Sequence, residues 1–151
     1  MAPSPTDPLS PEEDALLREL ARVALTLPRT FTADLGPVAG VSLSEYHALM
    51  HLSDAPGHAL RMSELAARTG LSLGAVTRVM RALETQGLAD RRRSVEDGRG
   101  QEAFLTDAGL ARLSEAIPAH RASARRQIFD RLDPAEVAAL ADALHRIGAG
   151  A

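Results

Sequence analysis

The sequence predicts a mainly α-helical chain that carries one small β-hairpin, and two observations support this fold class. Apolar residues recur at helical spacing along most of the 151 residues, in segments that open at a Ser, Thr or Asp. The exception is a pair of short extended segments, 88–95 and 101–105, joined by residues 96–100 with their Asp and two Gly. Since 45% of the residues are hydrophobic, the chain has enough apolar side chains for a buried core.

The first predicted helix begins after Ser10. The Ser10 hydroxyl can cap the helix, Pro11 suits its first position, and acidic residues follow near the positive end of the helix dipole. Its apolar stripe consists of Leu16, Leu17, Leu20, Val23 and Leu27. We expect the helix to be broken near Pro28, because proline removes a backbone donor and crowds the preceding turn.

A capping box marks the start of the second predicted helix. The side chains of Ser42 and Glu45 can each accept a hydrogen bond from the backbone N–H of the other residue. This helix is expected to run to about His51, because the Ala-Pro-Gly segment at 55–57 breaks the chain soon afterwards.

The third and fourth predicted helices, at about 63–69 and 72–86, are separated by a very short turn. Ala66, Gly70 and Val76 have the spacing of a helix-turn-helix. A small Ala lets the two helices approach, Gly70 can adopt a left-handed backbone, and Val76 can fill the junction. The pattern predicts a helix-turn-helix, although an ordinary helical hairpin uses the same common residue types.

The fourth helix divides into an apolar face and a polar face, since successive residues turn by about 100°. We expect the buried face to consist of Leu73, Val76, Val79, Met80 and Leu83. The other side carries Thr85 and the candidate DNA-binding residues Ser72, Gly74, Thr77, Arg78 and Arg81. Arg78 can donate two hydrogen bonds to a guanine, Arg81 is placed for a phosphate, and Gly74 leaves room for close approach. A solvated polar helix face would carry the same residue types.

The hairpin places a positively charged turn directly after the fourth helix, as in a winged helix-turn-helix. Arg99 is expected at its tip, where a guanidinium can enter a narrow minor groove. Asp97 can hold the turn by pairing with an arginine. Although the net charge is −3, residues 61–101 contain eight Arg and five acidic residues, a local charge of +3 that suits contact with DNA.

Two further helices complete the chain. Thr106 can cap the fifth, which is expected to extend to Phe129, with Pro118 kinking or dividing it. Asp133 can cap the last, whose apolar residues repeat at helical spacing. The terminal helices carry more apolar surface than one lobe can cover, so we expect a homodimer. The candidate interface residues are Leu16, Leu20, Val23, Leu140, Leu144 and Ile147.

Five motifs, by their order and spacing, resemble the MarR family of bacterial transcription regulators over residues 42–147. The motifs are MSELAARTG (62–70), VTRVMRALE (76–84), QGL (86–88), DGRG (97–100) and LTDAG (105–109). The resemblance implies a winged helix-turn-helix in a triangular, intertwined homodimer whose first, fifth and sixth helices interlock. It also implies a palindromic operator and, often, release by a small phenolic or anionic ligand. The wing Asp and Arg of the family correspond to Asp97 and Arg99.

Two features depart from the family. Gly74 stands where many relatives have a side chain that can touch DNA, so the pattern of base recognition is expected to differ. Pro28 and Pro118 interrupt helices that form the dimer in relatives, so the dimer geometry is expected to be shifted.

The residues and the resemblance together predict a sequence-specific, DNA-binding transcription regulator, a repressor that acts as a homodimer in the cytoplasm. No signal peptide and no run of about 18 apolar residues is present. The expected segments are N-terminal dimerisation (1–40), winged helix-turn-helix (41–105) and C-terminal dimerisation (106–151). A small-molecule effector is expected between the lobe and the dimerisation helices, and the candidate pocket residues are Tyr46, His47, Met50 and His51.

Other classes of function have less support in the sequence. His47 and His51, four residues apart, could bind a metal ion together with Glu45, His58 or His120, so a metal-responsive regulator is one alternative. A winged helix used only for protein contacts is the other. The absence of cysteine excludes disulfides, thiolate metal sites and thiol-based redox sensing. We find no GxSxG, P-loop, dinucleotide-binding turn or HExxH, so we expect neither an enzyme nor a cofactor.

Overall fold

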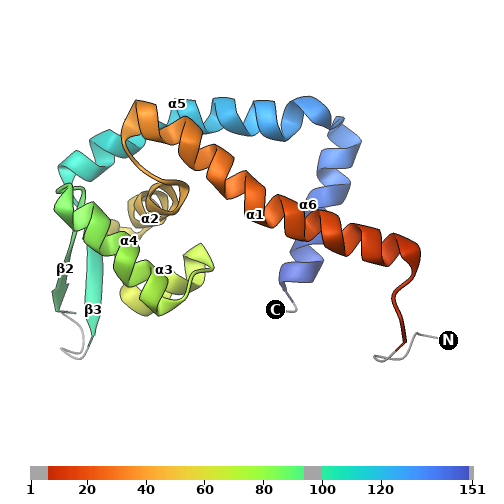
Figure 1. Ribbon diagram of the computed structural model, residues 1–151. Coiled ribbons are helices and arrows are strands. Elements are labelled where there is room, and N and C mark those ends of the chain that lie inside the picture. Colours follow the sequence, from red (N-terminus) through yellow and green to blue (C-terminus); the bar gives the residue numbers. More distant parts are fainter. Residues whose placement is uncertain (1–6, 94–99, 150–151) are drawn as a thin grey trace.

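The computed structural model describes residues 7–93 and 100–149, and it has the mainly helical fold that the sequence predicts (Figure 1). The helices of this part are α1 (Pro11–Ala39), α2 (Leu43–Asp54), α3 (Met62–Thr69), α4 (Leu73–Thr85), α5 (Asp107–Gln127) and α6 (Pro134–Gly148). Two short 3-10 helices are η1 (Pro56–His58) and η2 (Phe129–Arg131). The strands are β1 (Ala59–Arg61), β2 (Ala89–Arg93) and β3 (Gln101–Leu105). Helices α2, α3 and α4 and the strands form a lobe, from which α1 and α5 extend toward α6 (Figure 1).

The predicted cap residues set the starts of the helices. Five of them accept a hydrogen bond from a backbone N–H three residues later: Ser10, Ser42, Ser72, Thr106 and Asp133. Each bond satisfies a donor that the start of a helix leaves without an intrahelical partner. The starts of α1, α2, α4, α5 and α6 therefore lie where the sequence predicts them.

Pro28 and Pro118 lie inside α1 and α5 and do not divide these helices. The prediction that α1 is broken near Pro28 is wrong. A proline at position 28 removes the hydrogen bond to the carbonyl of Ala24, but both residues are exposed, so that carbonyl can bond water instead. Beyond the proline, Phe31 and Leu35 are buried, and this anchoring keeps α1 helical.

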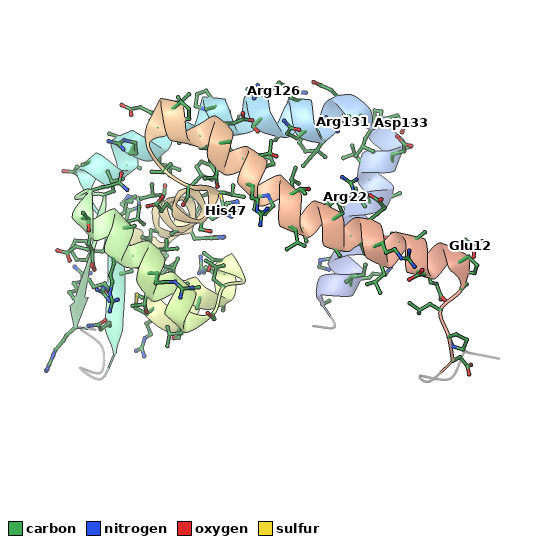
Figure 2. The ribbon with its side chains drawn as sticks, viewed as in Figure 1. Glu12, Arg22, His47, Arg126, Arg131 and Asp133 are labelled. Atoms are coloured by element: carbon green, nitrogen blue, oxygen red, sulfur yellow. The ribbon has the colours of Figure 1, made fainter. Side chains whose placement is uncertain are left out.

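A polar contact joins α1 to α5, which pack side by side. The Ser123 hydroxyl donates to the Asp34 carboxylate at 2.5 Å, and the Arg126 guanidinium, labelled on α5 in Figure 2, lies 3.0 Å from the same carboxylate. The hydrogen bond from Ser123, assisted by the charge of Arg126, lowers the pKa of Asp34. Asp34 is thus ionised at neutral pH and holds the two long helices together.

The sheet is antiparallel with strand order β1-β3-β2, and β1 was not predicted. Leu60 of β1 lies opposite Ala103 of β3, and Arg91 of β2 lies opposite the same residue from the other side. A strand of three residues is too short to show alternation, so only its pairing reveals it. Strands β2 and β3 match the predicted extended segments, while residues 94–99 of their connection lie outside the described residues.

The main core lies inside the lobe. Its fully buried large apolar residues are Leu35, Val41, Leu49, Leu52, Leu65, Val76, Met80, Leu83 and Leu88. The start of α5 closes this core, because Gly109 packs directly on the Leu88 backbone: an added Cβ would lie 1.9 Å from the Leu88 carbonyl oxygen. In contrast, α6 has no buried residue, and α1 has none before Phe31.

Candidate nucleic-acid interface

The turn between α3 and α4 has the geometry that the sequence predicts for a helix-turn-helix. Gly70 has a φ of 67°, in the left-handed region that favours glycine, and its N–H bonds back to the last turn of α3. The N–H of Leu71 donates to the Ala66 carbonyl at 3.2 Å. Ala66 is buried, and Val76 is only 1% exposed. These contacts fix the direction of α4 relative to α3.

The buried face of α4 agrees with the prediction except at its first residue. Val76, Met80 and Leu83 are buried, and Val79 is partly buried against them. The prediction that Leu73 is buried is wrong, because its side chain is 54% exposed. Ser72, Leu73 and Gly74 are all exposed, so the first turn of α4 extends past the edge of the core.

Arg78 and Arg81 place available positive charge on the outer face of α4. Both side chains are exposed, and neither forms an ion pair with another residue of 7–93 or 100–149. Arg68 of α3, in contrast, pairs with Glu64 at 2.7 Å. A guanidinium without an internal partner keeps its donors available for guanine or for phosphate.

The hydroxyl groups of α4 are already used within the helix. Thr77 Oγ1 donates to the Leu73 carbonyl at 2.8 Å, and Thr85 Oγ1 donates to the Arg81 carbonyl at 2.8 Å. Ser72 Oγ accepts from the backbone N–H of Ala75 at 3.2 Å. Thr77 in this arrangement can accept a hydrogen bond but not donate one, whereas Ser72 keeps its proton for a phosphate.

Glu84 and Arg91 connect the end of α4 to strand β2. Arg91 Nε lies 2.5 Å from Glu84 Oε1, and a second guanidinium nitrogen donates to Oε2 at 3.0 Å. The two side chains are 21% and 24% exposed, and the hydrogen bond that Arg91 donates to Glu84 raises the pKa of Arg91. This two-point contact fixes the base of the hairpin against α4. This pair could not be predicted from the sequence, because opposite charges seven residues apart on different elements give no local signal.

The remaining predicted DNA contacts are Gly74, Asp97 and Arg99. Gly74 is exposed, and a Cβ added there would meet no atom within 4 Å, so the α4 backbone is open to approach. Asp97 and Arg99 lie outside the described residues, so their wing contacts stay predictions.

A cavity of about 260 Å³ lies between α1, α2 and α5. Its lining residues are Val23, Ala24, Leu27, Pro28, Phe31, Leu43, His47 and His120. His47 projects from α2 beside α1 (Figure 2). Of the predicted pocket residues only His47 lines this cavity: Tyr46 is buried next to it, and Met50 and His51 are not part of the lining.

A cluster of rings forms the inner wall of this cavity. The His120 ring stacks on Tyr46 with centroids 4.3 Å apart, and its centroid lies 5.1 Å from that of Phe31. The His47 ring is 6.2 Å from that of His120. Burial lowers the pKa of both histidines, and the nearby His120 and His51 lower that of His47 further. Both imidazoles are therefore neutral at pH 7.

The predicted metal alternative gains no support from the arrangement of the histidines. Within residues 7–93 and 100–149, no three His, Cys, Asp or Glu side chains gather as a metal site requires.

In the same residues, no helix combines the length and the apolar character that a membrane span needs.

Comparisons with known proteins agree with the helix-turn-helix geometry. The family model of the MarR family matches residues 39–100. The Bacillus subtilis protein named HTH-type transcriptional repressor YetL is 36% identical over 81 residues, which span 54% of this chain and 48% of that protein. The Mycobacterium tuberculosis HTH-type transcriptional repressor Rv2887 is 38% identical over 100 residues, 65% of this chain and 70% of that protein.

A solved structure extends the likeness over almost the whole chain. Sco3205 is a MarR family transcriptional regulator from Streptomyces coelicolor, and its crystal structure is a complex with DNA. It superposes with a TM-score of 0.87 at 30% sequence identity, covering 94% of this chain and 92% of its own. Since the fold and the sequence both agree over most of the length, the chain belongs to the MarR family of transcriptional regulators.

Proposed function

We propose that this regulator is a repressor that binds a palindromic operator in double-stranded DNA through α4. The observation that carries the proposal is the pair of exposed arginines on the outer face of α4, Arg78 and Arg81, which form no ion pair within the described part of the chain. Family membership, the DNA in the Sco3205 crystal and the repressor names of two relatives support it. Such a protein would act in the cytoplasm, as a DNA-binding protein and not as an enzyme.

Each candidate contact receives a role from its surroundings. Arg78 lies in the second turn of α4 and would donate to a guanine edge, while Arg81, further along, would meet a phosphate. Ser72 would donate its free hydroxyl proton to a phosphate, and Gly74 would let the backbone approach. Thr77 would contribute only as an acceptor or through its methyl group, because its proton is bound to Leu73.

A homodimer would bring two copies of α4 to the same face of the DNA. The exposed apolar residues in the first half of α1 and in α6 support this part of the proposal; they are Leu16, Val23, Leu140, Leu144 and Ile147, with Leu20 partly exposed. Helix α6 has no buried residue in the single chain, so a second chain would supply the core that this end lacks. Two α4 helices about 34 Å apart would match one turn of the duplex.

A small-molecule effector would bind in the cavity between α1, α2 and α5. Helix α2 belongs to the DNA-binding lobe, whereas α1 and α5 continue into the proposed dimerisation region. A ligand beside His47 and His120 would therefore contact both parts. The ligand would release DNA only to the extent that it binds the arrangement of the lobe that cannot hold DNA more tightly than the arrangement that can.

The direct test is the salt dependence of DNA binding. The full chain is titrated into a fluorescent duplex that covers the region upstream of its own reading frame, in 50 and in 200 mM salt. Release of counterions from phosphates should weaken binding by about a hundredfold or more over this range. A protein-interaction module would bind no duplex at either salt concentration, and that result would remove the proposal.

A further inference from the structure

Leu73 is a large apolar side chain that the first turn of α4 holds in solvent. It is 54% exposed, whereas Val76 and Met80 of the same helix are buried. Its neighbours Ser72 and Gly74 are also exposed, and nothing lies within 4 Å of a Cβ placed on Gly74. More than half of the Leu73 surface is therefore open to solvent, and Gly74 has no side chain that would block the approach of a partner.

The hydrogen bond between Thr77 and Leu73 makes this edge of α4 almost purely apolar. Leu73 and Thr77 lie one helical turn apart, so they share an edge. Thr77 Oγ1 donates its proton to the Leu73 carbonyl at 2.8 Å, which uses the side-chain donor that lies one turn from Leu73. Arg78 lies about 140° round the helix from Leu73, and Arg81 lies about two turns further along the helix. The surroundings of Leu73 therefore differ in chemistry from those of the two arginines.

Bases in the major groove offer one large apolar group, the C5-methyl of thymine. Purines present acceptors there, and cytosine presents a donor, neither of which a leucine can satisfy. We infer that Leu73 is a specificity-determining residue that contacts a thymine methyl in each operator half-site. This inference rests on the proposed function, because it requires α4 to lie in the major groove.

The helix geometry also places this thymine relative to the guanine proposed for Arg78. The two residues are five positions apart, which corresponds to about 7.5 Å along the helix axis. Since both side chains would reach base edges within one major groove, the two bases should belong to the same half-site. Each half-site should therefore contain a thymine within a few base pairs of the guanine whose recognition depends on Arg78.

The test removes only the methyl group. Duplexes enriched by the full chain from a random-sequence pool are resynthesised with each half-site thymine replaced singly by deoxyuridine. One replacement, near the Arg78-dependent guanine, should weaken binding of the unaltered protein by about fourfold, the loss expected for one buried methyl. Leu73→Ala should bind the thymine and deoxyuridine duplexes equally well.

Leu25→Ala serves as the matched control, because Leu25 is 66% exposed and nine residues from Leu16, on the opposite side of α1 from the proposed interface. It should keep the fourfold preference for thymine. The inference is overturned if every deoxyuridine duplex binds the unaltered protein normally, or if Leu73→Ala keeps the same preference. If the pool yields no enriched duplex at all, the proposed function fails, and this inference fails with it.

Discussion

At the scale of single residues, the roles on α4 follow from the bonds that each side chain already makes. The sequence offers Thr77 as a hydrogen-bond donor to DNA. In the folded chain its hydroxyl already donates its proton to the Leu73 carbonyl. Arg78 and Arg81 are both exposed, and Arg81 lies almost one turn further along the helix. Distance from the first turn of α4 therefore decides which arginine reaches a base and which reaches the backbone of the DNA.

We expect Arg78→Ala and Arg81→Ala to weaken DNA binding in different ways. Loss of two hydrogen bonds to a guanine should cost Arg78→Ala about 1–3 kcal/mol and relax specificity at that base pair. Arg81→Ala should weaken binding to all sequences alike and reduce the salt slope by about one. Affinities for a set of single-base operator variants measure both effects. An equal loss at every base position for Arg78→Ala would contradict its assigned role.

The two cavity histidines should make stability depend on pH. Their pKa values in the folded chain lie below the ordinary value of 6.5, so the unfolded chain takes up protons first as the pH falls. The free energy of unfolding should be highest above pH 6.5 and should fall as the pH drops from there through the lowered values. Asp34, whose pKa is lowered from 3.8, contributes only in more acidic solution.

Urea denaturation at pH 7.5 and pH 5 measures this dependence. His120→Phe keeps a ring against Tyr46 and Phe31 but cannot be protonated, so its stability should fall less between the two pH values. If the free energy of unfolding of His120→Phe falls between the two pH values as much as that of the unaltered chain, His120 is not responsible for the pH dependence.

The sequence could predict some of these residues but not their contacts. The exposure of Arg78, Arg81 and Gly74 could be predicted from the helical period alone, because the faces of one helix depend on local spacing. His47 was predicted for the pocket, but its cavity neighbours on α1 and α5 were not, because chain folding alone brings Phe31 and His120 to it. The burial of Leu73 was predicted wrongly, since the same period cannot tell where the core ends.

At the scale of helices and strands, local signals were sufficient where a boundary depends on a few adjacent residues. The caps at Ser42, Ser72 and Asp133 determined the starts of three helices correctly. The continuity of α1 through Pro28 could not be predicted, because it depends on packing further along the helix. Strand β1 likewise depends on its pairing with β3.

Two glycines test how the base of the hairpin and α4 are built. Gly109→Ala should destabilise the fold by about 1–3 kcal/mol or more, because its Cβ would lie 1.9 Å from the Leu88 carbonyl oxygen. Gly74→Ala, with no atom within 4 Å, should instead stabilise it by about 0.5–1 kcal/mol through helix propensity. The urea midpoints of the two variants give these changes. If Gly109→Ala were as stable as the unaltered chain, α5 would not pack on Leu88 in this way.

At the scale of the whole molecule, the lobe has a buried core, whereas the region formed by α6 and the first half of α1 has none. The lobe buries its apolar side chains, while α6 and the first half of α1 expose theirs. The sequence suggested this imbalance through the number of apolar residues in the terminal helices. Their exposure in the folded single chain supports the same interpretation.

Light scattering at micromolar concentration should therefore give twice the 16.0 kDa mass of one chain. Leu144→Asp combined with Ile147→Asp should shift the protein toward monomer, because two charges would be buried in the proposed interface. Leu25→Asp, on the opposite side of α1, should remain a dimer. A monomeric mass for the unaltered chain would contradict the proposed assembly.

The central claim is that two copies of α4 are held at the pitch of the duplex, and a footprint of the protein on its selected DNA tests it most directly. Hydroxyl-radical cleavage of a selected duplex should show two protected half-sites, related by a twofold axis and about 10 base pairs apart from centre to centre. Protection of one isolated half-site, or no protection in low salt, would contradict it.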